Sequence, residues 1–525
     1  MKVTPAPADC NAGFPTGDYG CRDLPTGMSA LPKARHSRRV WRLLVLALSL
    51  SFSAFSRAEE PYVLWATTAG TATSGGMALS PTGELIVNSW QGKILKFDQR
   101  GSLTFSNAVL GIYLGSLTVD SSGATFLTGL IGTNGFFDFP TVQGFFTAKL
   151  NTSNTLLWVR SREFLGQPED PPFYDTRGTA IALDLQGNVI VGGSATGPIT
   201  MGSPQFGQGP GIVLCKYDRD GNLLWARVID HSPSGSFGAG INSLAVDQSG
   251  NIILTGFLSD GATDFGGTTV YPGSSGHSNG GDWYVARFKP NGDLHWVQLG
   301  YANFLTVDRH GDIYFSFDWA NPYSKGIGKI NSDGVLLWSK PLPNDVYPSG
   351  LAVDAQDQPV FTGYFTATVT LDGHTLNKQN IGWDFFAAKA NADGDIQWAI
   401  SGGGPGDDSA GSVICDSLGN EFLKGSLGKY AGSFDGIPMV PQSGADYTMF
   451  VTKLAQKPPL KIARSAQNAF LSWPVKATNY VLEAATSLPA ITWNPVTNTP
   501  TVGATERSVQ LPITGAAKFF RLRRP

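Results

Sequence analysis

The chain has 525 residues, of which 64 are glycine, 42% are hydrophobic and 15% are charged. This composition is too apolar for a disordered protein, and the glycines do not follow the collagen period. A chain of this length holds several average domains, or one large array of repeats with an additional module.

The first part of the chain has the pattern of an export signal. Basic residues within 33–42 precede an apolar run at 43–55, which is too short to span a bilayer comfortably. Ser56 and Ala58, in Ser56-Arg57-Ala58, are the small residues that a signal peptide carries just before its cleavage position. We therefore expect cleavage between Ala58 and Glu59, no transmembrane span, and a mature protein that is secreted or held in the cell envelope.

Segment 28–58 is accordingly the predicted signal peptide, with Met28 as the true start and residues 1–27 upstream of it. The letters SRRVWR contain the twin arginine of the folded-export route, whereas the leucine-rich run fits the ordinary unfolded route. Both routes stay open. No cysteine follows the apolar run at the cleavage position, which argues against a lipid anchor.

After residue 58 the chain carries 30 basic and 38 acidic residues, unevenly distributed. Residues 59–456 have a net charge of −15, whereas residues 457–525 have a net charge of +7. The acidity of the larger part argues against a nucleic acid partner. Only Cys215 and Cys415 remain there, both in strand-like runs, so we interpret them as core residues and exclude a disulfide framework.

Three short signatures recur along residues 59–456. The first is an aliphatic strand that usually ends in Asp: MALS, LTVD, IALD, LAVD, LTVD, LAVD and VICD, starting at 77, 117, 181, 244, 305, 351 and 413. The second is KILKF, FTAKL, VLCKY, YVARF, GIGKI, FAAKA and FVTKL. The third is a polar turn followed by a strand that carries Phe105, Trp158, Trp225, Trp296, Trp338 or Trp398.

Each unit contains four apolar runs separated by Gly, Asn and Asp turns, which is typical of antiparallel strands. Four such strands per unit predict the blade of a β-propeller, and the units number seven. The third signature is missing after the last unit, but Trp65 in PYVLWATTAG precedes the first. A ring explains this offset, because an N-terminal strand that completes the last blade removes an open sheet edge.

The repeated Asp, as in SLAVDQSGNIILTG at 243–256, has three interpretations: a catalyst, a metal ligand or a turn residue. Asp hydrogen-bonds its own backbone two residues on, and the Gly that follows adopts the positive φ of a tight reversal. We interpret it as a turn residue.

The longer segment SLAVDQSGNIILTGFLSDGATDFGG resembles the SBBP-type propeller repeat of secreted bacterial proteins. That repeat has an aliphatic-Val-Asp, a Gly-Asn turn, a short strand ending in Thr-Gly, and a loop with Phe and Gly. The resemblance covers most of 59–456 and is strong in units three, four and six. It implies a propeller in an envelope or extracellular setting, and it implies no activity.

Residues 457–525 contain short alternating strands and resemble the fibronectin type III-like modules that end many large secreted bacterial proteins, although the segment is short for seven full strands. The core of this small β-sandwich is expected to contain Trp473, Tyr480, Leu482, Trp493 and Phe520. LPITG at 511–515 matches a sortase signal by letter, but Lys518 interrupts the apolar stretch that sortase anchoring needs.

We predict no catalytic, cofactor-binding or metal-ligating residue. The five histidines after residue 58, at His231, His277, His295, His310 and His374, lack metal-ligand spacing and are predicted to lie at the surface or in turns. DRDGN at 218–222 resembles the start of a calcium loop, but its Gly comes too early and no Glu occupies the twelfth position. Whether calcium binds a turn stays open.

One enzyme alternative remains. In NSDGVLLW at 331–338 the Trp lies four residues after the Gly, whereas it lies three after in the Asp box of sialidase-type propellers. The four-residue spacing resembles the tryptophan strand of quinoprotein dehydrogenase propellers. The calcium and quinone ligands of those enzymes are not recognisable in this sequence.

The sequence thus predicts a secreted, monomeric, non-catalytic binding or interaction module. Its ligand is expected to be a polysaccharide or a protein, bound at the face with the long variable loops or over the central channel. The candidate loops are 130–144, 197–211, 258–282 and 365–383. No individual ligand-binding residue is predicted.

Overall fold

The computed structural model describes residues 60–71, 75–89, 92–108, 112–131, 144–161, 177–195, 199–200, 205–206, 211–233, 238–272, 281–300, 302–318, 325–379, 381–465, 467–475, 477–478, 480–486, 492–513 and 518–523. The predicted signal peptide at 28–58, its cleavage position between Ala58 and Glu59, and segment 1–27 lie outside the described residues. The described part of the chain contains strands and turns but no helix, so the predicted all-β class is confirmed.

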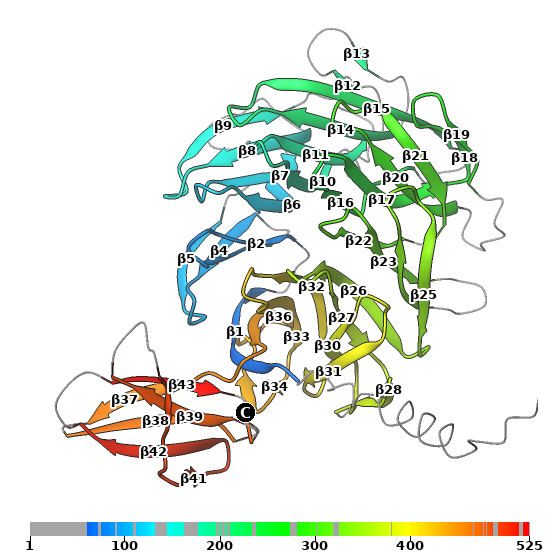
Figure 1. Ribbon diagram of the computed structural model, residues 1–525. Coiled ribbons are helices and arrows are strands. Elements are labelled where there is room, and N and C mark those ends of the chain that lie inside the picture. Colours follow the sequence, from blue (N-terminus) through cyan, green and yellow to red (C-terminus); the bar gives the residue numbers. More distant parts are fainter. Residues whose placement is uncertain are drawn as a thin grey trace, which may run out of the picture. The chain divides into compact units, whose positions relative to one another are not determined.

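Most strands form antiparallel sheets with four main strands, which we number in chain order (Figure 1). Sheet 1 contains β2 (Met77–Leu79), β3 (Leu85–Asn88), β4 (Lys93–Phe97) and β5 (Leu103–Ala108). Sheet 2 contains β6 (Ile112–Val119), β7 (Thr125–Ile131), β8 (Gly144–Leu150) and β9 (Leu156–Ser161). Sheet 3 contains β10 (Arg177–Leu183), β11 (Val189–Ala195), β14 (Gly211–Tyr217) and β15 (Leu223–Pro233).

The same plan continues along the chain. Sheet 4 contains β16 (Ser243–Val246), β17 (Ile252–Ser259), β20 (Gly281–Phe288) and β21 (Leu294–Leu299). Sheet 5 contains β22 (Phe304–Val307), β23 (Ile313–Asp318), β24 (Lys325–Ile330) and β25 (Leu336–Leu342). Sheet 6 contains β26 (Val346–Val353), β27 (Pro359–Phe365), β30 (Asp384–Ala390) and β31 (Ile396–Gly403). Sheet 7 contains β32 (Ser409–Cys415), β33 (Glu421–Gly428), β36 (Tyr447–Ala455) and β1 (Tyr62–Thr71).

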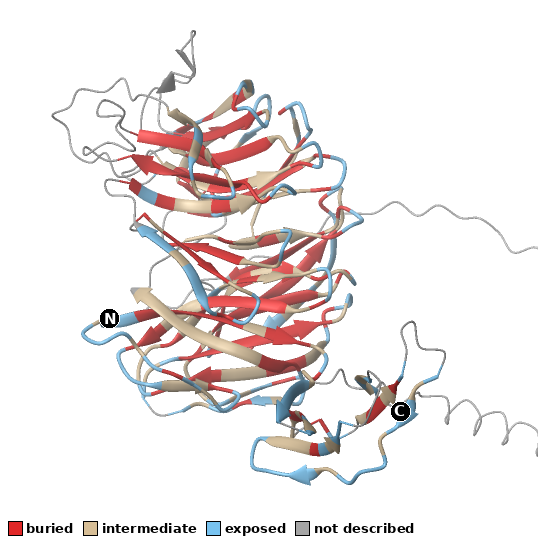
Figure 2. Cartoon of the chain, turned by 90° about the vertical axis from the view of Figure 1, so that its left-hand side faces the viewer, coloured by how far each residue is buried: buried red, intermediate tan, exposed pale blue. Residues whose placement is uncertain are grey.

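The first strand of each sheet faces a common central channel (Figure 1). Residues of β2, β6, β10, β16, β22, β26 and β32 all line this cavity, whose volume is about 1060 Å³. Buried residues run along the sheets, while exposed residues gather at turns and outer edges (Figure 2). Sheets arranged radially around a channel define a β-propeller fold.

The repeated Asp has the predicted turn role. The Oδ1 atom of Asp247 accepts hydrogen bonds from the backbone N–H groups of Ser249 (2.9 Å) and Asn251 (2.8 Å). The intervening Gly250 has a φ of 79°, which favours glycine. The turn interpretation is therefore confirmed by geometry.

The same Asp also has a partner that the sequence interpretation missed. The carboxylate of Asp247 forms a buried ion pair with Arg287, the basic residue of the second signature. Equivalent pairs are Asp120–Lys149 (3.7 Å), Asp184–Lys216 (2.9 Å), Asp308–Lys329 (3.1 Å), Asp354–Lys389 and Asp416–Lys453 (4.0 Å). In sheet 1 a Ser replaces the Asp, and burial there lowers the pKa of Lys96. The first two signatures therefore recur together because their charged residues pair.

The Thr-Gly of the repeat allows close packing. In sheet 4 the Thr255 hydroxyl donates to the carbonyl of Tyr284 (2.8 Å) and also to that of Ala302, on the way to sheet 5. The next residue, Gly256, lies so close to the carbonyl oxygen of Gly240 that any side chain would overlap it. The repeat keeps glycine here because of this close approach.

We expect Gly256→Ala to destabilise the protein by about 1–3 kcal/mol, since overpacked sites must shift backbone or neighbours. Gly411→Ala is the matched control, because an added methyl at this inner-strand position meets no atom within 4 Å. Chemical denaturation of both variants checks the prediction. Equal stability of the two variants would contradict it.

Tryptophans on the outer strands connect successive sheets. Four indole Nε1 groups donate to a carbonyl in the last turn of the next sheet: Trp158 to Arg219 (3.2 Å), Trp225 to Pro290 (3.1 Å), Trp296 to Ser332 (3.0 Å) and Trp338 to Ala392 (2.8 Å). Trp398 of β31 is the exception, because its buried Nε1 has no hydrogen-bond partner among the described residues. Trp65, on β1 of sheet 7, donates in the same way to Gln99 of sheet 1 (3.0 Å). The glycines of these turns lie against the indole rings. The third signature therefore joins neighbouring sheets.

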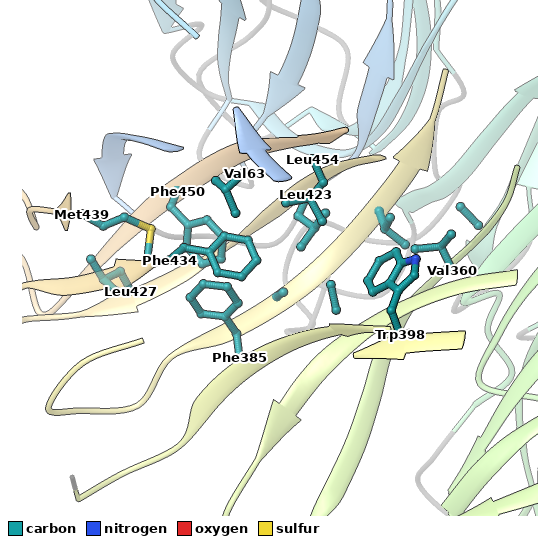
Figure 3. Close-up of a cluster of buried hydrophobic side chains, with 14 residues drawn as sticks. Val63, Val360, Phe385, Trp398, Leu423, Leu427, Phe434, Met439, Phe450 and Leu454 are labelled. Carbon is teal, nitrogen blue, oxygen red and sulfur yellow. The ribbon is translucent and has the colours of Figure 1, made fainter. Parts of the chain in front are cut away.

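Strand β1 lies at the outer edge of sheet 7, antiparallel to β36, from Tyr62 opposite Ala455 to Thr71 opposite Thr448. Its Val63 packs in a core with Trp398, Phe385 and Phe450 of sheets 6 and 7 (Figure 3). Trp65 packs against the core that sheet 1 shares with sheet 7. Tyr62, which is 1% exposed, packs in the core of the two sheets that follow residue 456. Three cores thus depend on β1.

Two connections form hairpins that extend a neighbouring sheet. The hairpin β18 (Gly261–Asp264) and β19 (Thr269–Val270) pairs with β15 of sheet 3. The hairpin β34 (Gly432–Phe434) and β35 (Ile437–Met439) pairs with β31 of sheet 6. The short pairs β12 (Ile199–Thr200) with β13 (Gln205–Phe206), and β28 (Val369–Leu371) with β29 (His374–Leu376), form separate two-stranded sheets.

The prediction that the histidines lie at the surface is wrong for His231. This side chain is 2% exposed, and its ring nitrogens contact the hydroxyls of Thr263 and Ser259, each at 2.8 Å. The hairpin β18–β19 covers it, a long-range contact that spacing does not reveal. His295 and His310 are exposed, and His277 lies outside the described residues.

Both cysteines after residue 58 lie in strands. Cys215 is buried in β14, and Cys415 is half-buried in β32. The interpretation as a core residue is confirmed for Cys215, whereas Cys415 is only half-buried and packs against the edge of a core.

After residue 456 the chain forms two further sheets. One has the order β37 (Lys461–Ser465), β38 (Asn468–Pro474), β42 (Glu506–Pro512), β41 (Thr501–Val502), and the other β40 (Asn494–Pro495), β39 (Val481–Ala485), β43 (Phe519–Arg523). Of the predicted core residues, Trp473 and Leu482 are buried, and Tyr480 and Phe520 pack against them. Trp493 is half-buried beneath the guanidinium of Arg521, 4.3 Å from its ring centre.

Candidate functional site

Three aromatic rings stack where β26 begins, β27 ends and β30 is about to begin. We call this end of the sheets, where the second strands end and the third strands begin, the loop face. The rings of Tyr347 and Tyr364 lie 4.7 Å apart with an interplanar angle of 5°. Those of Tyr364 and Trp383 lie 4.6 Å apart at 20°. We call this arrangement the aromatic stack.

Register places these rings together. Tyr347 and Tyr364 are directly opposite each other in the β26–β27 ladder, so their side chains share one face of the sheet. Trp383 immediately precedes β30, whose first residue, Asp384, pairs with Phe365. The strands β26 and β27 and the residue before β30 thus each contribute one ring at the same level.

A cation covers one end of the aromatic stack. The Nζ of Lys325, at the start of β24, lies 3.4 Å from the centre of the Tyr347 ring and donates to the carbonyl of Asn344 (2.9 Å). The ring quadrupole attracts such a cation. The other end is open, since Trp383 is 42% exposed.

Short connections hold Trp383 in place. Its backbone N–H donates to Oδ1 of Asp407 (3.2 Å), and its carbonyl accepts from the N–H of Asp408 (2.8 Å). Ile381 and Tyr430 lie beside this connection and are 90% and 50% exposed. The exposed indole therefore sits on an anchored backbone with apolar neighbours and a carboxylate next to it.

Two buried carboxylates support the same connections. Asp408 accepts from the N–H groups of Gly404 and Gly428, both at 2.7 Å, and Asp384 accepts from the N–H of Gln379. Burial raises the pKa of Asp408 to about 6 and also raises the pKa of Asp384. Each side chain is 1% exposed, so these carboxylates organise the backbone and do not reach a ligand at the surface.

Of the candidate loops, 365–383 is the one that contributes to the aromatic stack. Much of 258–282 instead forms the hairpin β18–β19, and most of 130–144 and 197–211 lies outside the described residues. The sequence interpretation missed the stacking residues of this site. A signal was present in TGYF and GWDFF, which place aromatic residues next to the Thr-Gly of the repeat and at the start of the third strand.

The described residues contain no cluster of three or more His, Cys, Asp or Glu side chains arranged to hold a metal ion. They also contain no helix with the length and apolar character needed to cross a bilayer. The exposed aromatic surface at this site is suited to binding.

No family profile and no curated protein matches the chain. Among solved structures, it is similar to BamB from Moraxella catarrhalis, with 12% identity over 75% of this chain and 88% of that chain and a TM-score of 0.40. Hydrazine synthase of Kuenenia stuttgartiensis has 10% identity over 68% of this chain and 94% of that one, with a TM-score of 0.41. Raptor of Chaetomium thermophilum has 10% identity over 75% of this chain and 29% of that chain, with a TM-score of 0.43. Similarities this distant assign neither a family nor an activity.

Proposed function

We propose that this protein is a secreted or envelope-held, monomeric, non-catalytic binding module that takes a polysaccharide on the aromatic stack. Its propeller, residues 59–456, has seven blades and is closed by β1, and residues 457–525 form a small fibronectin type III-like sandwich. The signal-peptide pattern at 28–58 and the resemblance to SBBP-type repeats support export. The pairing of β1 with β36 and the bond from Trp65 to Gln99 support closure.

The open indole of Trp383 is the observation that carries the proposal. A sugar ring presents a face of C–H groups, and the electron-rich face of an aromatic ring attracts such groups. Tyr364 covers the other face of the indole and keeps it rigid, which reduces the entropy lost on binding. The Asp407 carboxylate accepts from the backbone N–H of Trp383 through Oδ1, and its other oxygen can accept hydrogen bonds from sugar hydroxyls.

A polysaccharide fits this surface better than a protein does. The stable interfaces of proteins bury about 800 Å² per partner around a central apolar core. Here the exposed rings of Trp383 and Tyr430, with Ile381 and the Asp407 carboxylate at the same connection, match the size of one or two sugar units.

The Trp383→Ala variant is expected to weaken polysaccharide binding by about tenfold or more, corresponding to ~1.4 kcal/mol or more. The loss of binding is measured as the loss of retention, that is, of slowed migration of the purified protein in native gels cast with neutral and acidic polysaccharides. Trp383→Phe should keep part of the retention, because a smaller aromatic face remains. Tyr271→Ala, which removes an exposed ring that is not part of the aromatic stack, should change nothing.

Retention that is unaffected by Trp383→Ala would exclude the aromatic stack as the binding surface. No retention in any gel, together with saturable binding of a purified envelope protein, would replace the polysaccharide with a protein ligand. Turnover that depends on added quinone and calcium would instead favour the quinoprotein-type enzyme over a non-catalytic module.

A further inference from the structure

The central channel contains a charge that the proposed function does not use. Its walls consist mainly of Gly, Ser, Thr and aliphatic residues, and among its described lining residues Lys424 alone has a charged side chain. Lys424 occupies the middle of β33, at the position where the Thr-Gly repeats of sheets 2, 4 and 6 have Thr. A lysine at this position is therefore a departure from the repeat.

The amine of Lys424 is tightly held and buried. Its Nζ donates to the carbonyls of Gly75 and Asn88, each at 2.9 Å, and the residue is 4% exposed. Gly75 lines the same channel. Among the described residues no carboxylate lies within ion-pair distance of this amine, unlike the buried lysines of the repeated ion pairs.

Such a group is costly as a cation unless something compensates its charge. Burial lowers the pKa of the Lys424 amine to about 7. An ammonium has three N–H donors, and the two carbonyls use two of them. The third donor is left for an acceptor, and an anionic acceptor would also neutralise the charge.

We infer that the channel binds an oxygen anion, a carboxylate or a phosphate group, at Lys424. Ser412 is the cross-strand neighbour of Lys424, and Ser409 and Ser426 of the same sheet also line the channel, so hydroxyl donors stand on the channel wall that carries Lys424. Tyr447 adds a phenol to this wall, and the other described lining side chains do not titrate. The acidic body around the channel favours a small anion over a long polyanion. This site is separate from the aromatic stack.

The first test compares the native protein with Lys424→Thr, which restores the residue of the other repeats. Melting temperatures are measured in sodium acetate and in inorganic phosphate, with sodium chloride at the same ionic strength as the reference. The native protein should melt higher in acetate, phosphate or both, and the anion's apparent dissociation constant should rise at least tenfold in the variant. Acetate and phosphate together distinguish a carboxylate site from a phosphate site.

The second test needs no variant. Acetate does not titrate between pH 6 and pH 8, so its binding, followed by calorimetry in buffers of different ionisation enthalpy, reports proton uptake by the protein. Uptake is expected at pH 8 and should be nearly absent at pH 6, and the affinity should fall about tenfold for each pH unit above 7. Anion binding without proton uptake at pH 8, or no anion effect in the native protein, would overturn the inference.

The proposals for the two sites can be refuted independently of each other. Trp383→Ala should leave the anion effect unchanged, and Lys424→Thr should leave polysaccharide retention unchanged. Loss of polysaccharide retention in Lys424→Thr would mean that the variant disturbs the propeller as a whole. The calorimetric test on the native protein would then decide whether the anion site exists.

Discussion

Deleting residues 60–71 is expected to lower the melting temperature sharply and to promote aggregation. The deletion removes β1, which exposes the edge of β36 and takes the fully buried Tyr62, the buried Val63 and the half-buried Trp65 out of three cores. Removal of a large buried side chain costs about 3–5 kcal/mol, a sizeable share of the typical 5–15 kcal/mol of domain stability. An exposed strand edge also offers a template for pairing with other chains.

Trp65→Ala should lose part of this stability. The variant keeps the β1–β36 ladder but loses the hydrogen bond to Gln99 and the packing on Gly101. Calorimetry and light scattering during heating measure both effects. If the deletion left melting unchanged, the blades would close in another way and the proposed number of seven would have to be revised.

Arg287→Leu is expected to destabilise the protein by about 3–5 kcal/mol, because it leaves the Asp247 carboxylate buried without its counter-charge. Asp247 is 5% exposed, so water cannot replace the guanidinium. The matched control is Asp293→Ala, which breaks the surface pair of Arg227 and Asp293. The Asp293 side chain in that pair is 57% exposed, and the loss should stay below about 1 kcal/mol.

Urea unfolding of the two variants measures the difference. A double variant, Asp247→Asn with Arg287→Leu, should recover part of the lost stability, since the amide still caps the turn and no unpaired charge remains. Equal losses in Arg287→Leu and Asp293→Ala would show that burial of the repeated pair is energetically unimportant.

The strands and turns of this protein follow from short stretches of sequence. Alternation of apolar residues predicts the strands, and Asp with Gly in DQSGN predicts the tight turn that Asp247 forms with Ser249 and Asn251. These features were predictable because their interactions join residues two to four positions apart. The repetition of such hairpins also indicated sheets that need neighbours on both faces.

The chemistry of the surfaces was decided by the tertiary structure. Asp247 meets Arg287, and Tyr347 meets Tyr364 and Trp383, because strand register brings distant residues to one level of a sheet. Lys424 lies buried at the channel because sheet 7 packs against sheet 1, across more than 300 positions of the chain. Local patterns do not encode these contacts, since each depends on the register between strands and on the packing of one sheet against the next.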